Sequence, residues 1–364
     1  MKFPGFKILD RYITKKFLGT YFFAIALIIV VIVVFDAAEK MDNFIESKAP
    51  LSGIIFNYYL NYIPFMINQF SGLFTFIAVI FFTSKMAYNT EIIAILSGGV
   101  SFNRFLWPYF LSATTITLLS LLLSLFIIPS SQQRYLDFEV KYVKRNRTVK
   151  YDEHIFRQVT PGSFVYIRNF RGQNKQASYF ALETYEEGSL VSSLEAGNVK
   201  FDSVTMRWTA PEYIHRTFVN EVEHFEKHQK LDTMINLTTE ELGRVENLVK
   251  TLDYFELNKF VRQQREKGSD MIAVFEVEKY NRWAYPMASL ILTLMGVSLS
   301  SRKVRGGTGL HIGVGIALCF TYVLFMKFAE EFAKGGAIPP VISVWMPNVI
   351  FAVVALVLYR RAPK

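Results

Sequence analysis

Cysteine is almost absent from this chain: Cys319 is the single one among 364 residues, and it lies inside an apolar run. A lone cysteine excludes an intramolecular disulfide and a cluster of thiolate ligands around a metal ion. Charged residues make up 20% of the chain and hydrophobic residues 51%. The chain is too apolar for an ordinary soluble protein, yet it has more charge than membrane helices alone would carry. We therefore expect membrane spans together with one sizeable water-exposed domain.

The sequence also lacks the motifs of nucleotide binding and catalysis. The segment from Arg305 to Gly309 is rich in glycine, but it has no P-loop lysine and follows no strand. No G-x-S-x-G motif is present. His224 and His228 would lie on one face of a strand, but no H-E-x-x-H motif accompanies them. We therefore expect no catalytic residue, no metal site and no cofactor in this chain.

Six apolar runs are long enough to cross a bilayer. A basic segment, 1–16, precedes the first run and has one apolar helical face, which predicts an interfacial helix on the membrane surface. Residues 49–63 are uncharged and contain the polar residues Asn57 and Asn61, and Pro64 follows them. A helix breaker after a polar stretch predicts a second interfacial segment before the second run. The six runs are 17–35, 64–83, 105–128, 283–301, 308–326 and 342–359.

Ionisable side chains are nearly missing from the middle of these runs. Ion-coupled transporters usually need a relay of carboxylates or histidines near the midplane of the membrane. If the chain belongs to a transporter, we expect the energy for transport to come from another protein.

The net charge of +9 is carried by one side of the membrane. Six spans place both chain ends and the 84–104 loop on the same side, and these segments are strongly basic, whereas the two short loops on the other side are slightly acidic. Basic loops remain in the cytoplasm. The excess charge therefore indicates orientation, with both termini cytoplasmic, and we expect no nucleic-acid partner.

Residues 132–282 contain no spanning run and form the expected water-exposed domain, between 1–131 and 283–364. Repeated stretches of alternating apolar and polar residues, separated by turn residues, favour an antiparallel β sandwich or jelly roll. Two capping boxes, Thr238 with Glu241 and Asp253 with Glu256, predict two helices after the strands. The expected strands are 155–159, 163–170, 178–185, 195–201, 213–219 and 222–225.

The polar loop at 84–104 is expected to hold a short amphipathic helix near 88–98. Asn89 and Thr90 can cap such a helix, Glu91 lies in its first turn, and two glycines after Ser97 end it. Its apolar face either packs on the membrane helices of the same chain or docks a soluble partner, and the sequence leaves both alternatives open. The residues of that face are Ile92, Ile95 and Leu96.

The fifth run contains a face of small residues, Gly309, Gly313 and Gly315. Such a face lets another helix approach closely. Packing within the same bundle and packing against a second subunit are both open.

Several segments, taken in order with this topology, resemble the lipopolysaccharide export permeases of the LptF/LptG (YjgP/YjgQ) family. The resemblance runs through most of the chain, and the first and last of the segments favour LptG over LptF. The segments are Leu9 to Ile13, Thr90 to Ala94, Ser97 to Ser101, Tyr280 to Pro286 and Ile338 to Pro340.

The resemblance implies a non-enzymatic permease subunit in a bacterial inner membrane, with six transmembrane helices and a periplasmic β jelly roll between the third and fourth. It implies as partners an LptB-like ATPase dimer that binds the ATP, a second LptF/LptG-type permease, and LptC-like and LptA-like periplasmic proteins. The short cytoplasmic helix would couple to the ATPase. The implied coupling residues are Glu91, Ile92, Ile95, Leu96, Ser97 and Gly98.

The resemblance also implies a lateral gate for lipopolysaccharide, formed by the first span of one subunit and the fifth span of the other. Lysines that meet substrate phosphates are expected near the outer end of the first span, but here Lys40 is the one basic residue in that region, and Asp36 lies close to it. The implied gate and lipid-contact residues are Phe35, Asp36, Lys40, Gly309, Gly313 and Phe320.

Two other functions stay open on the sequence. A permease of another ABC-type exporter, for a lipoprotein or another amphiphile, would use the 84–104 loop in the same way. A membrane-anchored scaffold or enzyme that works through its outer domain would not need Glu91.

Overall fold

A computed structural model describes residues 7–143, 152–171, 175–202, 205, 207–219, 222–235, 237, 245–269, 271–302 and 307–362. The chain forms two compact units. One consists of Met1–Phe138 with Glu276–Lys364 and is helical, and the other is Glu139–Phe275 and contains the β-sheet.

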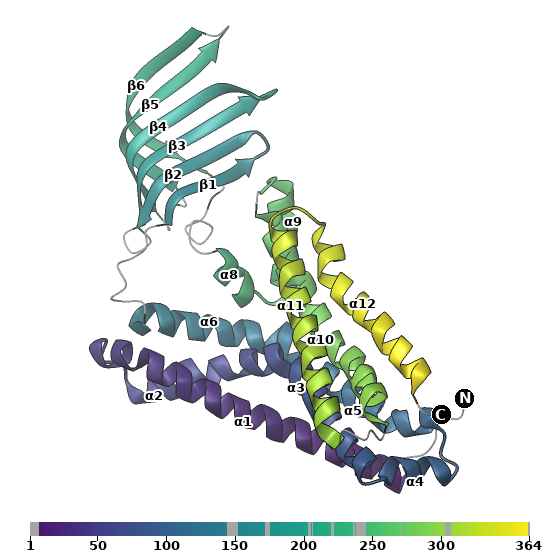
Figure 1. Ribbon diagram of the computed structural model, residues 1–364. Coiled ribbons are helices and arrows are strands. Elements are labelled where there is room, and N and C mark those ends of the chain that lie inside the picture. The colour runs from purple at the N-terminus through teal and green to yellow at the C-terminus, as the bar shows by residue number, and fades with distance from the viewer. Residues whose placement is uncertain are drawn as a thin grey trace. The chain divides into compact units, whose positions relative to one another are not determined.

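Six helices among the described residues are long and apolar enough to cross a membrane (Figure 1). Short π-helical segments, η1 to η3, interrupt the second and third of them without ending them. The six expected spans are therefore confirmed, and each helix extends beyond its apolar run. The helical segments are α1 (Ile8–Glu46), α2 (Leu51–Gly53), η1 (Ile54–Tyr59), α3 (Leu60–Tyr88), α5 (Phe102–Leu122), η2 (Leu123–Ile127), α6 (Ile128–Phe138), η3 (Glu139–Val143), α10 (Ile272–Ser300), α11 (Gly307–Lys334) and α12 (Pro340–Arg361).

The interfacial helix expected at the amino end is not separate, because α1 continues from Ile8 without a break. Ile13 and Phe17, on the apolar face of that expected helix, are fully buried in the core of the bundle. Phe17 packs against the rings of Phe82 and Tyr109, with centroids 5.7 and 6.1 Å apart. Amphipathic periodicity gives the same pattern for a helix on a membrane and for one against other helices.

The expected break before the second span is also wrong, since Leu51–Tyr88 is helical throughout. Pro64 lies inside α3. A proline removes one backbone hydrogen bond and crowds the preceding turn, and the π-helical segment η1 lies just before that turn. The side-chain amide of Asn61 donates to the backbone oxygens of Phe56 and Asn57, so this polar residue supports the helix instead of ending it.

Pairs of opposite charges lie within the spanning helices or between them. The guanidinium of Arg104 donates to both carboxylate oxygens of Asp10, at 2.5 and 2.6 Å. Near another helix end, Lys327 lies 3.0 Å from the buried carboxylate of Glu330. Paired charges of this kind can remain inside a membrane bundle because neither is left without a partner.

Gly315 of α11 permits a close approach to α3. A Cβ atom added at Gly315 would overlap Ile80, whereas Cβ atoms at Gly309 and Gly313 would meet nothing within 4 Å. We expect Gly315→Ala to lower the free energy of unfolding by about 1–3 kcal/mol through overpacking, and Gly313→Ala to change it little. Denaturant unfolding of the purified chain in detergent measures both values. Equal effects of the two variants would contradict the packing role of Gly315.

The second unit contains one antiparallel sheet in which each strand pairs with the next along the chain (Figure 1). All six predicted strands are present, and the expected strand-rich domain between the third and fourth spans is confirmed. The strand order among the described residues is that of a meander, in which each strand lies beside the strands that precede and follow it in sequence. In a Greek key, by contrast, the fourth strand returns to lie beside the first. The strands are β1 (Asp152–Thr160), β2 (Ser163–Arg171), β3 (Gln176–Glu186), β4 (Ser189–Asp202), β5 (Arg207–Val219) and β6 (Val222–Thr233).

One face of the sheet is a packed apolar core centred on Trp208. The ring of Trp208 is fully buried, and its centroid lies 5.0 Å from that of Phe201 and 6.0 Å from that of Phe180. Its indole nitrogen donates to the backbone oxygen of Leu237 at 3.3 Å. The alternation of apolar and polar residues produces this core, because it places one apolar set on one face of every strand.

Two helices, α8 (Val245–Thr251) and α9 (Tyr254–Glu266), follow the strands. The capping box of Asp253 and Glu256 is present, with the two reciprocal bonds at 2.7 and 3.1 Å. Thr238 and Glu241, the other predicted capping box, lie outside the described residues.

Candidate functional site

The loop between the second and third spanning helices holds the expected short helix, α4 (Glu91–Ser97). Thr90 precedes it in the left-handed region, with φ of 61°, and its side chain does not cap the helix. Gly99 follows with φ of 84°, a conformation that glycine adopts without strain.

The apolar face of α4 packs on the bundle of the same chain. Ile92 is 1% exposed, and Ile95 and Leu96 are half-buried against the same core. Of the two open alternatives for this face, packing on the chain's own helices is therefore the one observed. A partner protein cannot reach Ile92 unless the bundle opens.

A different part of α4 is exposed. Ile93 is 50% exposed, Tyr88 just before the helix is 61% exposed, and Ala94, Ser97 and Gly98 are open to solvent. Sequence reasoning missed Ile93, since it is the second of two isoleucines and falls outside the assigned apolar face. The sequence has no signal that separates it from Ile92, because its exposure depends on how α4 packs on the bundle.

Glu91 is tied to the first spanning helix. The hydroxyl of Tyr12 donates to Oε2 of Glu91 at 2.7 Å, and Nζ of Lys16 lies 3.6 Å from the same oxygen. Lys16 also donates to the hydroxyl of Tyr12. The amide of Asn89 reaches the other carboxylate oxygen at 3.4 Å. The first turn of α4 is thereby joined to α1.

Burial raises the pKa of Glu91, but hydrogen bonds from Tyr12 and Asn89 and the charge of Lys16 outweigh it and lower the pKa below its usual value. A carboxylate with a lowered pKa stabilises the folded loop above the unfolded pKa of about 4.3 and loses that contribution as the pH falls further. We expect faster backbone hydrogen exchange at 88–98 near pH 3.5 than at pH 6, after correction for intrinsic rates. Glu91→Gln should abolish this difference, and an unchanged difference would contradict the role of Glu91.

A second link joins α1 to the start of α5, on the other side of the loop. The Asp10 carboxylate is fully buried and binds Arg104 through both oxygens. The backbone nitrogen of Lys7 also donates to Asp10, at 2.8 Å, and so caps α1. The loop that carries α4 is thus held to α1 at its beginning and at its end.

The residues expected at a lateral gate divide into two groups. Phe35 of α1 and Phe320 of α11 are 73% and 59% exposed, and Gly309 and Gly313 are also open. In the most apolar 18-residue stretch of each spanning helix, 17% of α1 and 28% of α11 is buried inside the structure. These are the lowest values of the six spanning helices. These two helices are therefore the ones that the chain itself covers least.

Asp36 and Lys40 turn inward instead. Nζ of Lys40 lies 2.5 Å from Oδ1 of Asp36 and bonds the hydroxyl of Tyr58, and both charged side chains are mostly buried. The ring of Tyr58 packs on Phe44 and Tyr135, at centroid distances of 5.4 and 4.9 Å. The carboxylate neutralises the charge of Lys40 and joins α1 to η1.

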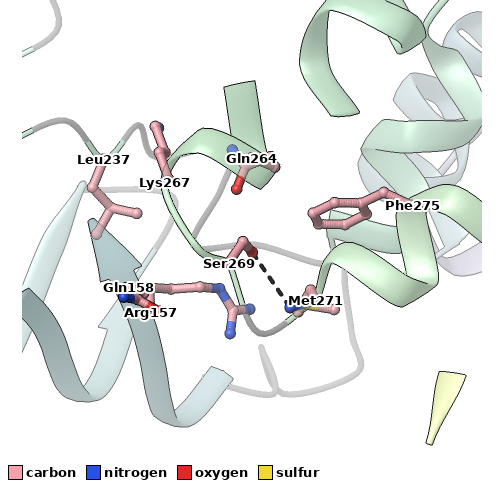
Figure 2. A pocket seen from close by; sticks show the side chains of 8 residues that line it. All are labelled: Arg157, Gln158, Leu237, Gln264, Lys267, Ser269, Met271 and Phe275. Atoms are coloured by element: carbon pink, nitrogen blue, oxygen red, sulfur yellow. Dashed lines mark hydrogen bonds between the residues drawn. The ribbon is translucent and has the colours of Figure 1, made fainter. Parts of the chain in front are cut away.

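The sheet unit contains a small cavity among its described residues. This cavity, lined by residues that include Arg157, Gln158 and Ser269, holds about 10 Å³, room for about one water molecule (Figure 2). A Cβ at Gly268 would meet Gln158 at 3.1 Å, so the turn there is tightly packed. Among the described residues, no three His, Cys, Asp or Glu side chains gather as metal ligands would.

No curated protein matches the chain. The family model "Lipopolysaccharide export system permease LptF/LptG" matches residues 11–361, which is nearly the whole chain. The chain belongs to the LptF/LptG family of lipopolysaccharide export permeases, whose members are multi-pass transport subunits of the inner membrane and not enzymes themselves.

Proposed function

We propose that this permease is one half of an ATP-driven exporter that extracts lipopolysaccharide from the inner membrane and passes it to a periplasmic protein bridge. A separate LptB-like ATPase dimer binds and hydrolyses the ATP. A second LptF/LptG-type permease completes the transport path, and LptC-like and LptA-like proteins receive the lipid. Both termini and α4 are cytoplasmic, and the sheet unit is periplasmic, because the basic loops lie on the side of the termini.

The bond between Glu91 and Tyr12 is the observation that carries this proposal. It joins α4, part of which is exposed, to α1, the least covered spanning helix. A push on α4 by the ATPase therefore reaches α1 through Tyr12 and Lys16, and Asp10 with Arg104 transmits the same movement from the far end of the loop. In this proposal Ile93, Ala94 and Ser97 meet the ATPase, and Ile92, Ile95 and Leu96 hold α4 on the bundle.

The open faces of α1 and α11 support a lateral gate. A lipid with several acyl chains loses about 0.8 kcal/mol for each CH₂ group that water contacts, so its path must remain apolar. Phe35 and Phe320 offer apolar contacts, and Gly309 and Gly313 leave room for a helix of the second permease. Lys40 is neutralised by Asp36 and holds α1 against η1, so it is not the group that binds a substrate phosphate.

The start at Leu9 to Ile13 and the segment Ile338 to Pro340 favour the LptG role for this chain. The second permease would then be of the LptF type.

Copurification tests the proposal. The tagged full chain is isolated in mild detergent, and every bound protein and lipid is identified by mass spectrometry. We expect an ATPase subunit, a second six-span permease and a molecule that contains lipid A. Recovery of an ATPase with a lipoprotein and no lipopolysaccharide would overturn the proposed substrate, and recovery of the chain alone would favour a membrane-anchored scaffold.

A variant pair tests the gate in the same experiment. Gly313→Leu fills the open face of α11 and should remove the second permease from the complex while the ATPase remains bound. Gly197→Leu is the matched control, since Gly197 of β4 also has nothing within 4 Å of an added Cβ. Retention of the second permease by Gly313→Leu would show that this face is not the seam.

A further inference from the structure

An apolar groove of about 360 Å³ runs between α5, α10 and α12 of the helical unit. Its walls are lined mainly by Leu106, Phe110, Leu290, Leu294 and Leu356. None of the helices proposed for the gate, α1 and α11, contributes to it. The function proposed above does not use this groove.

One end of the groove is polar. Asn103, near the start of α5, and Tyr359, near the end of α12, line it there, and the hydroxyl of Tyr359 donates to the side-chain oxygen of Asn103. The other end reaches Ala113. The distance along α5 from Asn103 to Ala113 is about 15 Å, which is about half the thickness of the hydrocarbon core. The groove therefore has the depth of a single leaflet.

Two arginines end the helix that carries Tyr359. Arg360 and Arg361 directly follow Tyr359 in α12, both are exposed, and neither is among the residues that line the groove. Neither has an ion pair among the described residues, and no acidic side chain lines the groove. Asp10 and Glu91, acidic residues of the same bundle, are engaged by Arg104 and by Tyr12 with Lys16. The two arginines therefore favour an anion beyond the polar end of the groove.

The volume of the groove sets what it can hold. About 360 Å³ along about 15 Å of α5 leaves room for a single hydrocarbon chain.

We propose that this groove binds one acyl chain of an anionic phospholipid whose phosphate lies against Arg360 and Arg361. Guanidinium groups bind phosphate through paired hydrogen bonds, so two adjacent arginines suit a lipid phosphate. Tyr359 and Asn103 lie where the glycerol region of the lipid would be, and both can form hydrogen bonds with its oxygens. The site is independent of the substrate path and of the identity of the exported lipid.

Native mass spectrometry of the purified full chain tests this proposal. The protein is titrated with phosphatidylglycerol and, separately, with phosphatidylcholine of the same acyl chains. We expect phosphatidylglycerol to bind at least tenfold more tightly. The double variant Arg360→Gln with Arg361→Gln should reduce phosphatidylglycerol binding to the level of phosphatidylcholine. Leu356→Trp should weaken the binding of both lipids, since Leu356 is 45% exposed and a larger side chain there fills the groove.

The matched control is the double variant Arg11→Gln with Lys15→Gln, which removes two exposed positive charges from α1. It should leave the preference for phosphatidylglycerol intact. If this control lost the preference for phosphatidylglycerol to the same extent, the preference would come from general electrostatic attraction, and the proposed site would be overturned. Normal lipid binding by Leu356→Trp would overturn the role of the groove, and full competition by inorganic phosphate would assign the arginines to a free anion.

Discussion

Arg104→Ala is expected to destabilise the helical unit strongly, because it breaks a buried ion pair. It leaves the carboxylate of Asp10, which is 0% exposed, without its partner. Loss of one partner from a buried ion pair costs about 3–5 kcal/mol. We expect about 3 kcal/mol here, because the Arg104 side chain is 20% exposed and water can partly replace it. Denaturant unfolding in detergent, followed by circular dichroism, measures the change.

Two further variants separate the ion pair from a general charge effect. Arg11→Ala removes an exposed arginine from the same end of α1 and should change stability by less than about 0.5 kcal/mol. The double variant Asp10→Asn with Arg104→Gln replaces both charges with neutral groups and should recover part of the loss. Similar destabilisation by Arg11→Ala and Arg104→Ala would show that the pair itself contributes little.

Ile93→Asp is expected to weaken binding of the ATPase subunit by about 30-fold or more. An apolar side chain at the centre of an interface contributes 2 kcal/mol or more, and a carboxylate in the same place would be buried without a partner. The folded chain itself should remain stable, because Ile93 is 50% exposed. Titration of the detergent-solubilised chain with the purified ATPase measures the affinity, and thermal unfolding checks stability.

Phe225→Asp is the matched control for Ile93→Asp. Phe225 is an apolar residue of β6 that is 73% exposed, so the substitution introduces the same charge far along the chain from α4. It should leave ATPase binding unchanged. Ile92→Ala, by contrast, should lower stability by about 2–4 kcal/mol through the loss of buried contacts. Unchanged ATPase affinity of Ile93→Asp would remove α4 from the proposed interface.

Much of the architecture could be predicted from the sequence alone. The six apolar runs identify the spanning helices because the bilayer requires a minimum length of apolar helix. The six strands are identified by alternation, since successive side chains in a strand point to opposite faces of a sheet. The capping box at Asp253 is local chemistry, and the structure contains both of its bonds. These features depend on neighbours within a few residues.

The two interfacial segments that local sequence patterns predicted were wrong. Ile13 and Phe17 have the periodicity of a surface helix, but the core of the bundle covers them. Pro64 is a helix breaker in isolation, but here the helix continues through it next to a π-helical segment. Contacts with distant parts of the chain outweigh the local preference at Ile13 and Phe17, whereas at Pro64 the neighbouring π-helical segment and the side chain of Asn61 let the helix continue.

The sequence determined that this protein crosses a membrane six times, carries an antiparallel sheet between its third and fourth spans, and belongs among the permeases that its motifs resemble. Only the tertiary structure decided which side of α4 is free, that Glu91 binds Tyr12 and Lys16, and that Asp36 neutralises Lys40. The physical reason is distance along the chain. Length, alternation and capping act between near neighbours, whereas burial and ion pairing join residues such as Asp10 and Arg104, which are far apart in sequence and meet only when the helices pack.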